Sequence, residues 1–190
     1  MTQRDALLEG AKRCLVEKGY GSTTARDIAA ASGAHLGSIG YHFGSKDHLL
    51  NLAVIELSGE WGDAIERAAR AAGGTNPAAR LESLLAELLA TLPGSLDVQS
   101  ASIQALAQAQ FDDELRRELA AGQPGARREL AAIVLGVRAE EVDEPTAHGL
   151  GSLVYALVTG MLAQALIDLD ALPDRELIAA ALGMLTGVRS

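Results

Sequence analysis

The stretch GAHLGSIGYHFGSKDHLL, from Gly33 to Leu50, decides the predicted fold of this chain. It gathers small and polar residues around two aromatic side chains and three histidines, and it carries a lysine near a predicted helix start. Such a segment could be a metal site, a catalytic site or a surface that binds another molecule. The residues before and after it favour the third possibility.

The segment that leads into this stretch, TTARDIAAASG at residues 23–33, predicts a short helix with a defined start. Thr24 and Asp27 have the spacing of a capping box, in which each side chain accepts a hydrogen bond from the backbone amide of the other residue. The helix is expected to continue through Ala31.

A tight turn and a second short helix are predicted to follow. Gly33 tolerates the positive φ that such a turn needs, and Ala29 is small enough for two helices to approach closely. The second helix is expected over residues 37–43, with Ile39 as its apolar anchor. This arrangement is typical of a helix-turn-helix motif, so residues 37–43 are predicted to enter the major groove of DNA.

The composition and periodicity of the whole chain predict an all-α fold of about nine helices. The chain has 190 residues, of which 48% are hydrophobic and only 3% aromatic, so Leu, Ala, Val and Ile must form most of the core. Ser45 is expected to cap a long helix that ends near Ala72, before the linker-like stretch AAGGTNP at 71–77. Further helices are expected near residues 96–109, 112–121, 126–136 and 174–188, with breaks at Gly122 and at Pro124-Gly125.

The charge distribution suggests two functional domains. Residues 1–48 carry six basic and five acidic side chains, whereas residues 49–190 carry ten basic and twenty acidic ones. A charge asymmetry of this kind indicates separate partners for the two parts. We expect a DNA-binding domain at 1–48 and a helical ligand-binding and dimerisation domain at 49–190. The single Cys14 and an N-terminus without an apolar leader predict a cytoplasmic protein, associated with the nucleoid when it is bound to DNA.

The uncharged segment at 149–167 is long enough to be considered as a membrane span. Its flanks are acidic and lack the basic residues that anchor such spans, so we expect a helix buried in protein and no membrane partner. The last helix carries Ile178, Ala181, Leu182 and Leu185 on one stripe. Two apolar helices at the C-terminus would bury each other incompletely in a monomer, which predicts a homodimer.

A metal site built from His35, His42 and His48 is not expected. Their spacing crosses a turn, and the sequence suggests no cysteine or carboxylate that converges with them. No nucleophile–base pair stands out either, so the chain is not expected to be an enzyme or to need a cofactor. The alternative kept open is a helical small-molecule-binding protein or enzyme that retains the fold without binding an operator.

Together, TTARDIAAASG (23–33) and GSIGYHFGSKDHL (37–49) resemble the N-terminal domain of the TetR family of bacterial transcriptional regulators, over about residues 4–55. The resemblance implies a homodimer that binds a palindromic operator in double-stranded DNA. It also implies a repressor whose C-terminal domain binds a small-molecule effector, and a dimer interface formed by the last two helices.

The resemblance assigns backbone contacts to the start of the first motif helix, base contacts to the second, and a phosphate contact to Lys46. With the polar groups expected on the exposed side of the recognition helix, the predicted DNA-binding residues are Thr24, Arg26, His35, Leu36, Gly37, Ser38, Tyr41, His42 and Lys46. Gly40 stands where relatives often have an aromatic residue, and its role is left open.

The ligand-binding residues are predicted from polar and aromatic side chains among the apolar helices. They are Trp61, Gln104, Gln108, Tyr155 and Thr159. Because the expected interior is mainly aliphatic, the effector is expected to be neutral or weakly cationic and largely apolar.

Overall fold

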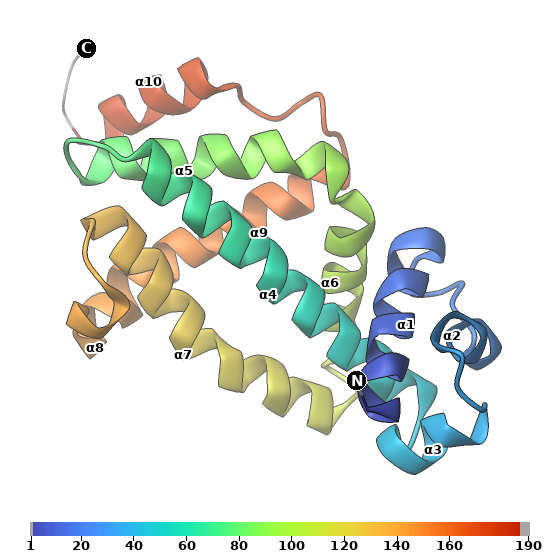
Figure 1. Cartoon of the computed structure of the whole chain (residues 1–190). Coiled ribbons are helices and arrows are strands. Elements are labelled where there is room, and N and C mark those ends of the chain that lie inside the picture. The colour runs from blue at the N-terminus through green and yellow to red at the C-terminus, as the bar shows by residue number, and fades with distance from the viewer. Residues whose placement is uncertain (1, 187–190) are drawn as a thin grey trace. The chain divides into compact units, whose positions relative to one another are not determined.

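The computed structural model describes residues 2–186, and within that range the protein is entirely helical, without strands (Figure 1). The α-helical segments are α1 (Gln3–Lys18), α2 (Ala25–Ser32), α3 (Gly37–Phe43), α4 (Lys46–Ala72), α5 (Pro77–Thr91), α6 (Leu96–Gln108), α7 (Asp113–Leu135), α8 (Glu144–Thr146), α9 (Ser152–Ala165) and α10 (Arg175–Thr186). A π-helical segment, η3 (Ala147–Gly151), joins α8 and α9 into one continuous helix. The described residues therefore form nine separate α-helices, as predicted.

Two compact units are present, and each has its own core. The first contains the chain up to Trp61 together with Asp97–Leu119, and the second contains Gly62–Leu96 and the chain from Ala120 onward. The predicted domain boundary after residue 48 does not coincide with this division. The reason is that α1–α3 share their core with the first half of α4, with α6 and with the start of α7. Its fully buried members include Leu7, Ile28, Leu49, Leu50, Ala53, Ala101, Ala105 and Leu115.

The close crossing of α1 and α2 fixes the first unit. A Cβ added at Gly10 would lie 2.9 Å from Ser32 Cβ, 3.0 Å from Ser32 N and 3.1 Å from the Ile28 carbonyl oxygen. Only a glycine lets the two backbones approach this closely.

In the second unit, α10 packs along α5 (Figure 1), and Arg175 Nε lies 2.9 Å from Glu82 Oε1. Leu84, Leu85 and Leu88 of α5 are buried. The helix predicted at 174–188 is observed as α10, and Val188 lies outside the described residues. Its apolar stripe is divided, because Ile178 is buried whereas Leu185 is exposed.

The predicted break near residue 124 is wrong. α7 runs without interruption from Asp113 to Leu135, with Pro124 inside it. Proline removes one backbone hydrogen bond, the one that the Ala120 carbonyl would accept. Ala120, Gly122, Pro124 and Gly125 are all exposed, so water can reach this carbonyl and the helix can continue.

The apolar C-terminal segment is less buried than predicted. The run Glu144–Ala165 is long and apolar enough to cross a membrane by length and composition alone, a test that core helices also pass. Within the single chain, only 22% of the most apolar 18-residue stretch of this run is buried. Val154, Met161 and Ala165 point into the unit, but Leu153 and Leu157 remain exposed. A single chain thus leaves one face of α9 uncovered.

Candidate nucleic-acid interface

The start of α2 is held by the predicted capping box. The Asp27 amide donates to Thr24 Oγ1 at 3.2 Å, and the Thr24 amide donates to Asp27 Oδ2 at 2.9 Å. Lys18 Nζ donates to Asp27 Oδ1 at 2.5 Å, and this bond, with those from Thr24, lowers the pKa of the Asp27 carboxyl from its usual value. Thr24 and Arg26 are both exposed at this rigid helix start.

The turn after α2 has the predicted conformation. Gly33 adopts φ 69° and ψ 15°, in the left-handed region, and ends the helix. α3 is then anchored by Ile39 and Phe43, which are 3% and 6% exposed. The Arg4 guanidinium lies 5.1 Å from the centre of the Phe43 ring. One side of α3 is therefore fixed to the core by apolar contacts.

The opposite side of α3 carries the predicted base-reading residues. Tyr41 is 85% exposed, and its ring meets that of His42 edge-on at 4.9 Å. His42 is half-buried, with Nε2 3.3 Å from Gln3 Oε1 of α1. Ser38 is half-buried, and its amide donates to the His35 carbonyl at 2.9 Å. Tyr41 is thus a large side chain that the motif leaves almost fully exposed.

The approach to α3 is also exposed. His35 and Gly37 face solvent, and Leu36 is 48% exposed. Leu36 is the N-cap residue of α3 and Gly37 is its first residue, so these three predicted residues lie at or just before the start of that helix. They extend the accessible surface beyond α3 itself.

Lys46 makes internal contacts. Its Nζ donates to the Thr23 carbonyl at 3.3 Å and lies 2.9 Å from Asp47 Oδ1. Ser45 caps α4 as predicted, since its Oγ accepts from the His48 amide at 3.0 Å. These two contacts hold the lysine at the start of α4, and a phosphate at Lys46 would have to compete with the Asp47 carboxylate.

Gly40 is not required by the fold. A Cβ at this position would meet no atom within 4 Å, and Gly40 is not among the glycines with positive φ. Neither a turn nor a helix crossing explains the glycine. Its effect is to leave bare backbone on the exposed face of α3, next to Tyr41.

Sequence reasoning missed two features of the first unit, the neighbours of α3 on α1 and the burial of Lys12. Gln3 and Arg4 lie beside α3, although the sequence marks α1 only as a helix with an apolar stripe. Lys12, counted there among the basic residues, is buried and bonds to Glu9 and Glu60. Desolvation lowers the pKa of Lys12, but the bonds to these carboxylates outweigh it, and the net effect is a raised pKa. The lysine contributes to stability rather than to a free positive surface.

The five predicted ligand-binding residues fall into both units. Trp61 is half-buried on α4, and its Nε1 is buried without an acceptor among the described residues. Gln104 and Gln108 are exposed on α6, and Gln104 donates to Ser100 Oγ at 3.2 Å. Tyr155 and Thr159 are half-buried on α9 of the second unit. The binding role of all five remains a prediction.

Gln99 is a further candidate for ligand binding. It is only 2% exposed, and its Nε2 has no hydrogen-bond partner among the described residues. α4 and α6 meet where Ser58 Oγ and Ser102 Oγ lie 2.7 Å apart. Trp61 follows Ser58 by one helical turn, and Gln99 precedes Ser102 by one turn. α4 runs away from the helix-turn-helix and α6 runs back toward it. The two unpaired donors, Trp61 Nε1 and Gln99 Nε2, therefore both lie beyond the Ser58–Ser102 contact, on the side away from the helix-turn-helix.

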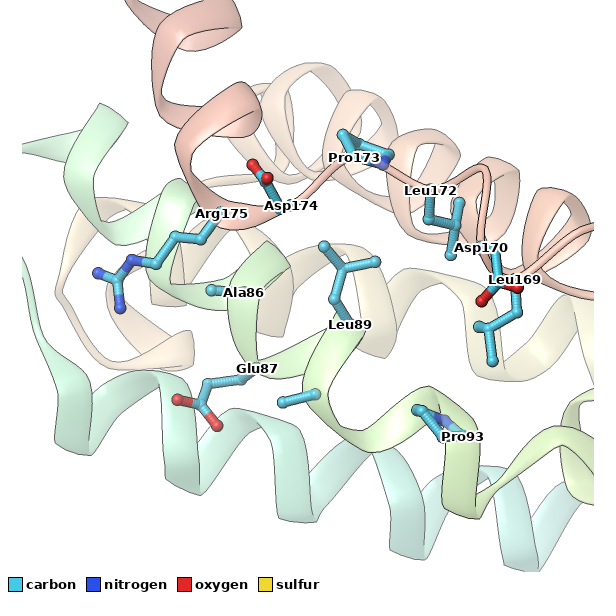
Figure 2. Close-up of a pocket in the computed structure, with 11 residues that line it drawn as sticks. Ala86, Glu87, Leu89, Pro93, Leu169, Asp170, Leu172, Pro173, Asp174 and Arg175 are labelled. Carbon is cyan, nitrogen blue, oxygen red and sulfur yellow. The ribbon is translucent and has the colours of Figure 1, made fainter.

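A groove of about 580 Å³ lies in the second unit, between the end of α5 and the segment that leads into α10 (Figure 2). Leu89 and Pro93 line one side, and the other side carries Leu169, Leu172 and Pro173. The charged lining residues are Glu87, Asp170, Asp174 and Arg175. Since Arg175 is paired with Glu82, the groove has a negative rim over an apolar floor. None of the predicted ligand-binding residues lines it.

The expectation that no carboxylate converges with His48 is wrong. Glu114 and Glu118 of α7 come within 4.8 Å of His48, counted between their ligand atoms. His35 and His42 are not part of this group. The three residues are far apart in sequence, so spacing alone could not have revealed them.

Comparison with family models supports both parts of the chain. A model described as "Bacterial regulatory proteins, tetR family" matches residues 7–53. A second, described as "BetI-type transcriptional repressor, C-terminal", matches residues 77–188. The first covers the helix-turn-helix, and the second covers more than half of the chain.

The chain is also similar to a curated protein, the HTH-type transcriptional repressor AcnR of Corynebacterium glutamicum. The two are 46% identical over 46 residues, which is 24% of this chain and 24% of that repressor. The match therefore spans about a quarter of the relative's length.

Among solved structures, a putative transcriptional regulator from Rhodococcus sp. RHA1 shares the fold, with a TM-score of 0.75, 18% identity and coverage of 100% of this chain and 97% of the other. The multidrug binding protein EbrR, solved with imidazole, is 28% identical with a TM-score of 0.66, covering 96% of this chain and 88% of EbrR. These matches extend over both units. The chain belongs to the TetR family of bacterial transcriptional regulators, which are not enzymes, with an N-terminal helix-turn-helix domain and a C-terminal domain of the BetI repressor type.

Proposed function

We propose that the protein is a sequence-specific transcriptional repressor whose binding to a palindromic operator is controlled by a small-molecule effector. The observation that carries the proposal is the division of α3 into two sides. Ile39 and Phe43 fix one side to the core, while Tyr41 projects from the other. A short helix held in this way can be inserted into a major groove without unfolding the motif.

The proposed DNA contacts fall into two classes. Thr24, Arg26 and Lys46 would hold phosphates, because they lie at two helix starts and carry a hydroxyl or a cation. Ser38 and Tyr41 would read base edges, and the remaining predicted residues, His35, Leu36, Gly37 and His42, would complete the surface around them. Gly40 would let the duplex approach the α3 backbone closely.

A gel-shift experiment on DNA upstream of the protein's own gene, at several salt concentrations, tests this proposal. Lys46→Ala should weaken binding about equally on all sequences and reduce the salt slope by about 1. Tyr41→Ala and Ser38→Ala should change sequence preference, at a cost of about 1–3 kcal/mol for each lost base contact. If binding depends on neither salt nor sequence, the alternative of a small-molecule-binding protein without an operator is favoured.

The proposed dimer uses the last two helices. On α9, Leu153 and Leu157 are exposed, and on α10, Leu177, Met184 and Leu185 are exposed. If these side chains form extended apolar faces, such faces would be unusual on a protein that remains monomeric. A two-fold dimer would cover them and present two α3 helices to successive major grooves, about 34–36 Å apart.

The proposed effector site in the first unit includes Trp61 and Gln99. An unpaired buried N–H costs about 1–3 kcal/mol, and an acceptor on a ligand would remove that cost at both donors. EbrR has been solved with imidazole and with proflavin, both compounds with ring nitrogens. We therefore propose, as the sequence suggested, a neutral or weakly cationic and largely apolar effector. It would also offer a hydrogen-bond acceptor to Trp61 and Gln99. Gln104, Gln108, Tyr155 and Thr159 stay secondary candidates.

The groove in Figure 2 is the competing effector site. Its three carboxylates favour a cation, and its leucines and prolines favour an apolar body. A ligand there would contact α10, one of the two helices of the proposed dimer.

The proposed control acts through helices that continue from one unit to the other. α4 and α7 both do so, and both contain helix-weakening residues near that point, Gly59 and Gly62 in α4 and Gly122 and Pro124 in α7. A ligand that changes the bend of α4 would change the spacing of the recognition helices. The regulator would act in the cytoplasm, on the nucleoid.

A further inference from the structure

Three side chains that bind metals in other proteins lie together in the first unit, away from α3. They are His48 of α4 and Glu114 and Glu118 of α7, and their ligand atoms all lie within 4.8 Å of one another. His48 Nδ1 is 4.0 Å from Glu114 Oε2. Such a set of one imidazole and two carboxylates is not explained by the DNA-binding motif.

Rigid elements hold the cluster on both sides. On α7, Asp112 Oδ1 accepts from the amides of Glu114 and Leu115, both at 3.0 Å, which caps the helix. Leu115 is 1% exposed and belongs to the same core as Leu49, the neighbour of His48. The core therefore holds the first turn of α4 against the first turn of α7, whether or not the cluster binds an ion.

The cluster is electrostatically incomplete. Glu118 Oε2 is buried and accepts no hydrogen bond from any described residue. Glu114 and Glu118 are four residues apart on one helix, an arrangement in which like charges destabilise the helix slightly. A buried carboxylate oxygen without a donor is costly, and a bound cation is the simplest partner for two carboxylates.

We infer that His48, Glu114 and Glu118 bind one divalent transition-metal ion. Imidazole nitrogen favours ions such as Zn²⁺ over Mg²⁺ and Ca²⁺, which prefer oxygen ligands alone. Around a tetrahedral ion with bonds of 2.0–2.1 Å, ligand atoms lie about 3.3 Å apart. Ligand atoms that lie up to 4.8 Å apart must therefore approach each other by up to about 1.5 Å to reach that geometry. Glu114 is 63% exposed and can rotate to supply the movement. The remaining coordination position is left for water.

Metal binding also has a consequence for DNA binding, and this step rests on the proposed function. His48 of the cluster lies in the first turn of α4, which also carries Lys46. A divalent ion would tie that turn to α7 and cancel two negative charges in the DNA-binding unit. Both effects favour binding to phosphates, so the metal should raise operator affinity.

Isothermal titration of the full-length protein with ZnCl₂, after removal of metal by chelation, tests the inference. One ion per chain is expected to bind. His48→Ala and Glu118→Gln should each weaken binding by about 10-fold or more. Glu118→Gln keeps the size of the side chain, so it serves if His48→Ala disturbs folding. Substituting Co²⁺ for Zn²⁺ should give visible absorption bands that His48→Ala alters, which reports a metal–imidazole bond directly.

Two controls separate this site from ordinary surface binding. His148→Ala and Glu17→Gln remove an exposed histidine and an exposed carboxylate elsewhere, and both should leave the Zn²⁺ titration unchanged. The inference is overturned if no saturable binding occurs, if Mg²⁺ binds as tightly as Zn²⁺, or if His48→Ala and Glu118→Gln bind like the wild type. If the wild-type protein binds Zn²⁺ at this site but binds no operator DNA, the proposed function fails and the metal site stands.

Discussion

The two compact units differ in how completely they bury their apolar residues. In the first, α1–α4, α6 and the start of α7 surround one continuous core, and the recognition helix is anchored on it. In the second, α9 and α10 leave Leu153, Leu157, Leu177 and Leu185 exposed. The first unit thus covers its apolar core within one chain, whereas the second leaves apolar side chains in solvent that the proposed dimer would cover.

The largest expected effect comes from introducing charge on the uncovered face. Leu153 is 68% exposed, so Leu153→Glu should leave the single chain folded. It should prevent dimerisation, because the carboxylate would be buried at the interface without a partner. Analytical ultracentrifugation should then show a monomer, and operator affinity should fall by about 100-fold or more, since two half-sites are no longer bound together.

Leu106→Glu is the matched control, because Leu106 is an exposed leucine of the first unit at 39%. This variant should sediment like the wild type. A dimeric Leu153→Glu protein would place the interface elsewhere and would remove the explanation given for the open face of α9.

An intermediate effect is expected at the α1–α2 crossing. Gly10→Ala brings a Cβ to within 3.0 Å of the Ser32 backbone nitrogen, so the two helices must separate. Overpacking of this kind costs about 1–3 kcal/mol. Chemical denaturation followed by circular dichroism should show that loss.

Gly40→Ala provides the contrast to Gly10→Ala. Its Cβ meets no atom within 4 Å, so the free protein should become more stable, by up to about 1 kcal/mol. If DNA approaches the α3 backbone at this point, the same variant should bind the operator more weakly. Equal stability changes in the two variants would contradict the assignment of Gly10 to a crossing and Gly40 to an open face.

The smallest effect is expected at the proposed effector site. Trp61→Phe removes an N–H but keeps an aromatic ring, and Gln99→Leu removes the second donor. Each should weaken effector binding by about 1 kcal/mol, roughly fivefold, in a thermal-shift titration with compounds that the wild type binds. Asp174→Asn in the groove should have no effect. If the groove variant weakens binding and Trp61→Phe does not, the effector belongs to the second unit.

The features that the sequence by itself determined depend on residues close together in the chain. The capping box at Thr24 and Asp27, the left-handed turn at Gly33 and the cap at Ser45 all involve partners within a few residues. Backbone sterics and local hydrogen bonds fix such features whatever surrounds them. The helix-turn-helix, and with it most of the candidate DNA-binding surface, was therefore predictable.

Only the tertiary structure decided the features that join distant residues. The continuity of α7 through Pro124 depends on solvent reaching a freed carbonyl, and the contact at Gly10 depends on where α2 crosses α1. Lys46 bonds to the Thr23 carbonyl, and His48 meets two carboxylates more than sixty residues later. No local pattern encodes these contacts, because each arises when packing of the apolar core brings separate helices together.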